Sequence, residues 1–378
     1  MKPDFFLKTC FLVLCAILIG SCEKKGNPPE PEVGNPSDRE LMLAHYADEI
    51  VIPAYANFKV KLDSLSNKSE DFTSNPTNTS LVELRNAWKE AYIEWQKVEL
   101  FDFGPAFNVG LRSFFNIYPA SVSGINDNIL SGTANLEVPA SYPQQGFPAL
   151  DYLINGLGAT DNDILAFYTS ASDASPRIAY LQKLITQLNY KFNQVYSIWI
   201  GSYRNEFVSK TSMDMSSSTS LMVNAYVLNY ERYIRSGKFG IPGGVMTGTA
   251  FPEKVESFYM KDLSLILAET AHQASIDFFN GKSVKTGVEG PSLKTYLNSL
   301  DAKDGPTGAS LTQTINDQFA LAEAKLDLLN DNLYQEIQTN NPAVVDVYNA
   351  MQGAVRMLKV DMTSAMSITI TYTDNDGD

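Results

Sequence analysis

The sequence predicts an all-α protein built from two packed helical bundles, on three observations. Apolar residues recur at helical spacing through most of the chain. Strand signals are scarce, the best being an alternation of Ile, Thr and Tyr at 367–373, which we expect to be either extended or helical. A Ser-rich break at 210–218 separates two helix-rich halves, as a domain hinge or a long loop. We therefore predict domains at 38–209 and 210–378.

The clearest helix is predicted to begin near residue 81. Ser80 precedes Leu81, and Glu83 stands where the acidic partner of a capping box falls. The apolar face that follows recurs at helical spacing and consists of Leu84, Trp88, Ala91, Trp95 and Val98.

Amphipathic patterns predict the remaining long helices. Pro176 and Pro342 stand at first-turn positions, where proline is tolerated, and Gly237 suits a C-terminal cap. The predicted helical stretches are 39–65, 176–200, 219–236, 261–280, 310–339 and 343–360.

The N-terminus has the pattern of a bacterial lipoprotein signal. Lys2 and Lys8 precede an apolar run that is too short to span a bilayer as a mature helix. Ile-Gly-Ser-Cys at 19–22 then matches a lipobox. We predict a cleaved signal at 1–21 and a lipid on Cys22, the first residue of the mature protein.

Residues 22–37 are rich in Pro, Glu, Lys and Gly, which predicts a flexible tether. The expected location is the bacterial cell envelope, lipid-anchored in the outer membrane and facing either the periplasm or the outside. Cys10 and Cys15 would leave with the signal, so the mature chain would have no free thiol and no disulfide.

The chain is acidic, with 29 basic and 43 acidic residues and a net charge of −14. Removing the signal would leave 27 basic and 42 acidic side chains, a net charge of about −15. Because an acidic surface repels phosphate backbones, the sequence excludes nucleic acid as a partner.

Glu99 is the first candidate site residue. Trp88, Tyr92, Trp95 and Glu99 share one helix face, which puts a carboxylate at the end of an aromatic stripe. Burying the carboxylate unpaired would cost several kcal/mol, so we expect a partner for it. Glu99 is therefore either a site carboxylate or half of a structural ion pair.

The two histidines give little support to a metal site. Glu269 and His272 form a Glu-x-x-His pair, but a di-iron bundle needs that pair twice. His45 and Glu49 are spaced i, i+4 near the start of the first helix. We expect both histidines at surfaces or interfaces, and the count argues against a His-rich zinc site.

Two further patterns each have a structural and a functional interpretation. Tyr226, Tyr230 and Tyr233 line one helix face and are either core residues or ligands for ferric iron. The acidic tail at 374–378 is either solvated or the start of a calcium loop, although the bidentate Glu of such a loop is missing.

The segment 146–151 has the frame of a metal motif without its metal ligand. Gly146 comes first and Asp151 sixth, with Pro148 at the third position, where a histidine would share a helix face with the acid. Proline has no side-chain donor and cannot bind a metal.

Several segments together resemble the imelysin family, the peptidase M75-like and iron-regulated protein A-like group. The resemblance covers about 38–378 and rests on the order and spacing of 88–99, 103–105, 118–119, 146–156, 235–242, 358–361 and 374–378. It implies an all-α fold of two four-helix-bundle-like domains with a site between them. It also implies export, a link to iron uptake or regulation, and metallopeptidase activity in some members.

The family's Gly-x-His-x-x-Glu signature falls on Gly146, Pro148 and Asp151, so the histidine is lost and the acid is one methylene shorter. We expect these residues to form a ligand pocket with Glu99, and Arg112 to serve as counter-ion. The predicted function is a non-catalytic envelope lipoprotein that binds a ligand at the domain junction, with iron or an envelope protein as partner. The alternatives are a metallopeptidase with an altered iron or zinc site and an adhesive or structural surface protein.

Overall fold

The computed structural model describes residues 36–373, which belong to a compact unit formed by residues 34–378. Cys22, most of the predicted tether and the acidic tail at 374–378 lie outside the described residues. The described part is helical, with isolated bridges but no strand. The all-α prediction is confirmed. Within residues 36–373, no helix is both long and apolar enough to cross a membrane.

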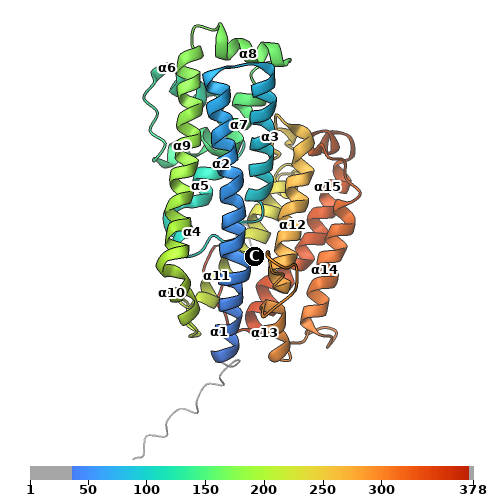
Figure 1. Cartoon of the computed structure of the whole chain (residues 1–378). Helices are drawn as coiled ribbons and strands as arrows, with labels where there is room; N and C mark the ends of the chain where they lie inside the picture. The colour runs from blue at the N-terminus through green and yellow to red at the C-terminus, as the bar shows by residue number, and fades with distance from the viewer. Residues whose placement is uncertain (1–35, 374–378) are drawn as a thin grey trace, which may run out of the picture. The chain divides into compact units, whose positions relative to one another are not determined.

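The first half of the chain forms a four-helix bundle (Figure 1). Its first helix is continuous through α1 (Pro36–His45), η1 (Tyr46–Val51) and α2 (Ile52–Ser74). The other three are α3 (Asn78–Trp95), α7 (Gly146–Asn155) and α9 (Ala174–Ile198). Short elements connect them: α4 (Pro105–Val109), α5 (Leu111–Phe115), α6 (Val122–Ser131), η2 (Pro139–Gln144) and α8 (Asp161–Thr169). The elements η3 (Trp199–Tyr203) and α10 (Arg204–Ser209) follow α9.

The second half also packs four long helical segments together. They are α11 (Ser218–Leu228) continued by η4 (Asn229–Gly240), α12 (Ser264–Asn280), α14 (Leu311–Leu326) and α15 (Leu333–Arg356). The smaller elements are η5 (Pro252–Lys254), η6 (Lys261–Leu263), α13 (Leu293–Ser299), η7 (Met357–Met362) and α16 (Thr363–Ala365). The Ser-rich stretch forms an irregular connection between α10 and α11.

Two helix boundaries differ from the sequence prediction, and a third agrees with it. α3 begins at Asn78 with Thr77 as N-cap, and Ser80 is its N3 partner in the capping box, so the cap predicted at Ser80 was wrong. Gly237 lies inside η4 and caps nothing, because the π-helical geometry continues to Gly240. α15 is kinked at Asn340, just before Pro342, which agrees with the predicted break between two helices.

The segment 367–373 forms neither a helix nor a strand, so the helical alternative is wrong. The side chain of Asn224 on α11 hydrogen-bonds to the backbone of this segment. Its Nδ2 donates to Thr369 O at 3.0 Å, and its Oδ1 accepts from Thr371 N at 2.8 Å. The Tyr372 hydroxyl donates to Glu231 Oε2 at 2.7 Å. One side-chain amide thus satisfies backbone groups that a sheet would otherwise pair.

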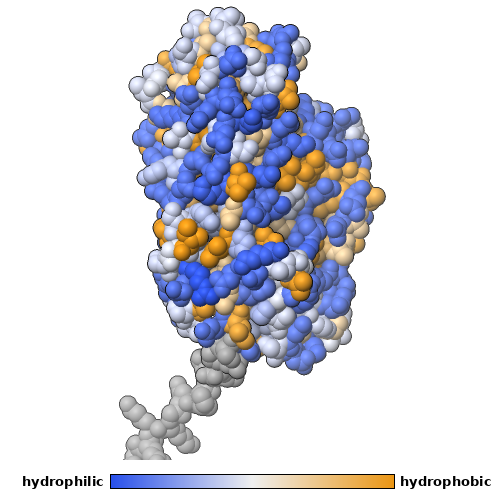
Figure 2. Space-filling model, viewed as in Figure 1, coloured by the Kyte–Doolittle hydropathy of each residue, from blue (hydrophilic) through white to orange (hydrophobic). Residues whose placement is uncertain are grey.

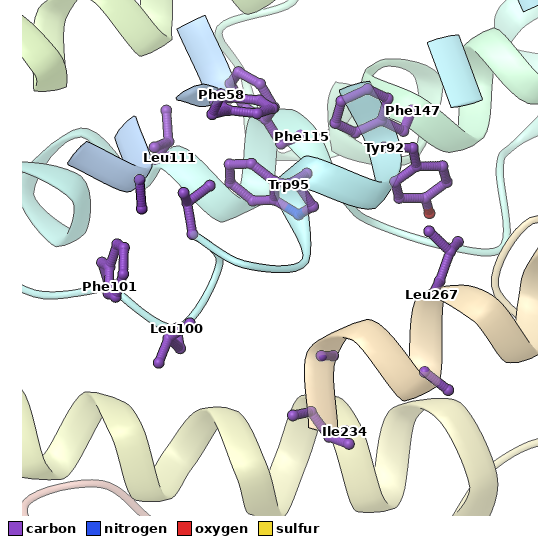
Figure 3. Packing of buried hydrophobic residues seen from close by; sticks show 14 of the residues in the cluster. Phe58, Tyr92, Trp95, Leu100, Phe101, Leu111, Phe115, Phe147, Ile234 and Leu267 are labelled. Carbon is purple, nitrogen blue, oxygen red and sulfur yellow. The ribbon is translucent and has the colours of Figure 1, made fainter. Parts of the chain in front are cut away.

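Buried side chains from both halves form one hydrophobic cluster (Figure 3). Trp95 stacks on Phe115, and Tyr92 stacks on Phe147, each with ring centroids 4.5 Å apart. The same cluster contains Leu267 of α12. Because the core continues from the first half into the second, the domain boundary at 210 stays a prediction.

Candidate functional site

Gly146 sets the start of helix α7 and with it the position of the motif. Its φ of +77° lies in the region that favours glycine, and a Cβ there would lie 2.3 Å from the carbonyl oxygen of Phe115. Pro148 follows in the first turn, where its missing N–H costs no helical hydrogen bond. Close backbone packing against Phe115 therefore requires glycine and fixes where Pro148 and Asp151 point.

Pro148 and Asp151 line a pocket of about 200 Å³, which we call the Tyr118 pocket. The two halves of the chain both contribute to it. Its lining consists of Tyr118, Pro119, Ala120, Pro148 and Asp151 from the first half and Glu253, Val255, Ser257, Phe258 and Tyr259 from the second. The lining is mainly aromatic and apolar, with the exposed Glu253 as a second carboxylate.

The Asp151 carboxylate is buried and holds the backbone of the 259–260 segment. Its Oδ2 accepts from Tyr259 N at 2.8 Å, and its Oδ1 accepts from Met260 N at 3.0 Å. Asn155 Nδ2 donates to the same Oδ1 at 2.9 Å. Burial raises the pKa of Asp151 to about 6, although these hydrogen bonds oppose the shift. Asp151 therefore joins the two halves through neutral donors.

A second group of polar side chains, the buried charge cluster, contains the buried Glu99, Asn116, Gln96, Lys238 and Glu256 and the half-buried Arg112. Arg112 Nε lies 2.8 Å from Glu99 Oε1, and its guanidinium carbon lies 3.3 Å from the ring centre of Tyr233. Burial raises the pKa of Glu99, and Arg112 opposes that rise. The expected counter-ion of Glu99 thus lies in contact with it.

The other ion pair of the cluster joins Lys238 on η4 to Glu256. Lys238 Nζ also donates to Gln96 Oε1 at 2.8 Å, and Gln96 Nε2 donates to Glu256 Oε1 at 2.9 Å. Burial alone would raise the pKa of Glu256, but Lys238 and the hydrogen bonds outweigh it and lower the pKa. Both charged groups of this pair thus have a second hydrogen-bond partner in Gln96.

Asn116 connects the two ion pairs. Its Nδ2 donates to Glu256 Oε1 at 2.8 Å and lies 3.5 Å from both oxygens of Glu99. Its Oδ1 accepts from the Tyr92 hydroxyl at 2.7 Å. Two acidic and two basic side chains thus balance in one network between the 96–116 segment and the 238–256 segment.

Tyr118 lies between the pocket and the cluster. It lines the pocket, and burial together with the Glu256 carboxylate raises its pKa well above the usual value. Pro148 and Asp151 thus share the pocket, whereas Glu99 and Arg112 pair with each other in the cluster and do not line it. A role for any of these residues in ligand binding stays a prediction.

The residues present do not fit the metal that the family motif implies. Pro148 offers no donor atom, and both oxygens of Asp151 are engaged by hydrogen bonds. Within residues 36–373, no three or more His, Cys, Asp or Glu side chains are grouped so as to hold a metal ion.

The histidines serve packing. His272 is buried, contrary to the prediction, with Nδ1 3.2 Å from the Tyr230 hydroxyl and Nε2 3.2 Å from Phe319 O. Burial lowers its pKa to about 4, so the ring is neutral near pH 7. His45 Nε2 lies 2.8 Å from Gly281 O, at the hairpin that follows α12.

The tyrosine stripe does not stay on one face. Tyr226 and Tyr230 are core residues, with the Tyr226 hydroxyl donating to Ser275 O at 3.0 Å. Burial raises the pKa of both phenols, which disfavours the phenolate that would bind ferric iron. Tyr233 turns instead toward Arg112, because the π-helix η4 shifts the periodicity after Leu228.

The second ion pair, between Lys238 and Glu256, was not predicted from the sequence. Lys238 stands in the 235–242 stretch that carries the family resemblance, and Tyr118 stands in 118–119, so both lie in marked segments. Glu256 stands in a stretch with no local pattern, and only the fold brings it to Lys238.

The family model described as imelysin, peptidase M75, matches residues 51–360. The chain belongs to the imelysin family. Iron-regulated protein A of Synechococcus elongatus is 22% identical to it over 286 residues, which is 74% of this chain and 73% of that protein. This family membership agrees with the resemblance found in the sequence.

Two solved structures of imelysin-like proteins share the fold. One is described as an iron-regulated protein A precursor from Parabacteroides distasonis, with a TM-score of 0.66 and 16% identity over 89% of this chain and 97% of the other. The other is an imelysin-like protein from Psychrobacter arcticum, with a TM-score of 0.68 and 18% identity over 89% and 98%. These likenesses support two packed helical bundles, as the resemblance implied.

Proposed function

We propose that this imelysin-family protein is a cell-envelope lipoprotein, anchored through Cys22, that binds a ligand in the Tyr118 pocket without hydrolysing it. The proposal rests on the family motif, in which the histidine is replaced and the acid is engaged in hydrogen bonds. Pro148 lines the pocket where a histidine would stand, and Asp151 uses its carboxylate to hold the backbone of residues 259 and 260.

A metallopeptidase needs a metal with two or three protein ligands and an open position for water. Glu253 is the remaining carboxylate of the pocket, and it is exposed. Neither it nor Asp151 has a histidine beside it. This donor set argues against the metallopeptidase alternative and favours binding.

The pocket's lining favours a small organic ligand over a bare metal ion. A cavity of about 200 Å³ walled by Tyr118, Phe258, Tyr259 and two prolines offers apolar contact with few polar anchors. The name of the Synechococcus relative, iron-regulated protein A, supports a link to iron, which we propose is a role in iron uptake. In this proposal the protein serves that role through its ligand or a partner, without coordinating iron at Pro148 and Asp151.

A retention experiment tests the binding claim. Residues 34–378, which form a compact unit of their own, are incubated with the small-molecule fraction of a bacterial envelope extract. Native mass spectrometry then identifies what stays bound. We expect one small ligand per chain, lost in Ala120→Trp, which fills the pocket, and kept in Glu83→Gln on the surface of α3.

A cleavage assay tests the claim that no hydrolysis occurs. The same protein is incubated with unfolded casein, with and without a chelator. We expect no cleavage above a buffer control. Chelator-sensitive cleavage that is lost in the double variant Asp151→Ala and Glu99→Ala would overturn the non-catalytic claim and favour the metallopeptidase.

A further inference from the structure

A second concave region lies away from the Tyr118 pocket, where the end of α3 meets α12. Two adjoining hollows of about 340 and 470 Å³ share the residues Lys97, Ala274 and Asp277. Because they share these residues, they form one extended depression, which we call the α3–α12 groove. In Figure 1, α12 lies beside α3, and α14 packs on the side of α12 that faces away from α3.

The first hollow has an apolar floor. The side chains of Leu100, Phe101 and Phe278 close it from below, and Val284 of the hairpin after α12 forms an exposed wall. Figure 2 shows that on the visible face of the molecule apolar residues form separate patches within a largely hydrophilic surface. The hollow is therefore suited to one large apolar side chain rather than to a broad apolar surface.

The second hollow is acidic. Glu269, Glu323 and Asp327 line it, and within residues 36–373 no lysine or arginine forms an ion pair with any of the three. Lys97 is the basic residue of its lining, and its ammonium already lies 2.7 Å from Glu94 Oε2. A surplus of negative charge therefore faces the hollow.

Like-charge repulsion in and around the second hollow points to a cationic occupant. Burial raises the pKa of Glu269, and the carboxylates of Asp327 and Asp331 add to the rise. A bound cation would relieve this repulsion. Because the same surplus repels anionic lipid and nucleic acid, neither surface fits the groove.

We propose that the α3–α12 groove docks an extended basic segment of a partner protein. One large apolar side chain of the segment enters the first hollow, and a neighbouring lysine or arginine reaches Glu269, Glu323 and Asp327 in the second. A peptide fits better than a small molecule because the two hollows adjoin and differ in chemistry. This site is independent of the ligand proposed for the Tyr118 pocket.

Fluorescence anisotropy with a defined probe tests the proposal on residues 34–378. The probe is a labelled hexapeptide, acetyl-Gly-Leu-Phe-Lys-Arg-Gly-amide. Two comparison peptides replace either Leu-Phe by Ser-Ser or Lys-Arg by Glu-Glu. We expect saturable binding of the probe that weakens with added salt, weaker binding of the Ser-Ser peptide, and no binding of the Glu-Glu peptide.

Surface variants assign the binding to the groove without endangering the fold. Glu323→Gln with Asp327→Asn removes two exposed carboxylates and should weaken probe binding about tenfold. Asn57→Trp, at the exposed rim of the first hollow, should weaken it by a similar factor, about tenfold. The matched control, Glu83→Gln with Glu90→Gln on the outer face of α3, changes the net charge equally and should leave binding unchanged.

The proposal is overturned if the probe does not bind the parent chain, or if the control and the Glu323 and Asp327 double variant bind the probe with equal affinity. It is also overturned if the Glu-Glu peptide binds as well as the probe. Binding that depends on the two carboxylates but not on Asn57→Trp would refute the anchor in the first hollow.

Discussion

Two buried carboxylates, Asp151 and Glu256, lie between the same halves of the chain but are stabilised differently. Glu256 is paired with the Lys238 ammonium and also accepts from Asn116 and Gln96. Asp151 accepts hydrogen bonds from two backbone amides and one side-chain amide, all of them neutral. The pKa of Glu256 is lowered as a result, whereas burial raises the pKa of Asp151 to about 6.

A site can keep its backbone frame while its chemistry changes, because the two carboxylates are held in different ways. A carboxylate held by neutral donors fixes the backbone and stays sensitive to pH, because nothing offsets its charge. A carboxylate held by a buried cation is insensitive to pH near neutrality, but it depends on that cation. Asp151 has become a structural residue of the first kind, which agrees with the loss of histidine at Pro148.

The largest expected effect comes from breaking the buried pair. Lys238→Met leaves Glu256 charged, buried and without its cation, so we expect the free energy of unfolding to fall by about 3–5 kcal/mol in urea denaturation. Adding Glu256→Gln should recover part of the loss. Lys254→Met, which changes a lysine stacked on Phe251, should cost far less, and equal losses in the two lysine variants would contradict the pairing argument.

The pH dependence of Asp151 gives the next largest effect. Because its pKa is raised in the folded state, its contribution to stability is full below pH 4, falls as the pH rises toward 6, and is constant above that. Asp151→Asn removes this dependence. The stability of the variant relative to the parent should therefore rise by about 3 kcal/mol between pH 4 and pH 7. A difference that does not change with pH would show that Asp151 is not shifted.

A smaller effect on stability is expected at Gly146, where comparison with Gly110 distinguishes a steric clash from backbone strain. Gly146→Ala and Gly110→Ala both place alanine at a positive φ, but a Cβ at Gly146 meets Phe115 O, whereas one at Gly110 meets nothing within 4 Å. We expect Gly146→Ala to be less stable than Gly110→Ala by about 2 kcal/mol in thermal or urea unfolding. Equal stabilities would mean that α7 can shift away from Phe115.

The helical periodicity of the sequence was enough to predict the fold class and most of the long helices. Local pattern also marked Glu99 and Arg112 and the position of Pro148. The π-helix η4 could not be predicted, because a shift of one residue in the helical repeat leaves no compositional signal, and it sends Tyr233 away from Tyr226 and Tyr230. Glu256 and the backbone donors of Asp151 come from a loop whose path only tertiary packing defines.

Metal binding by residues 34–378 tests most directly whether the motif at Gly146, Pro148 and Asp151 has lost its metal. Calorimetric titration with ferric iron, ferrous iron and zinc, followed by metal analysis after dialysis, measures whether the motif still holds an ion. We expect no stoichiometric metal in the parent chain and no change in Asp151→Ala, because Pro148 offers no ligand and Asp151 holds the backbone. One tightly bound metal ion per chain that disappears in Asp151→Ala would contradict it.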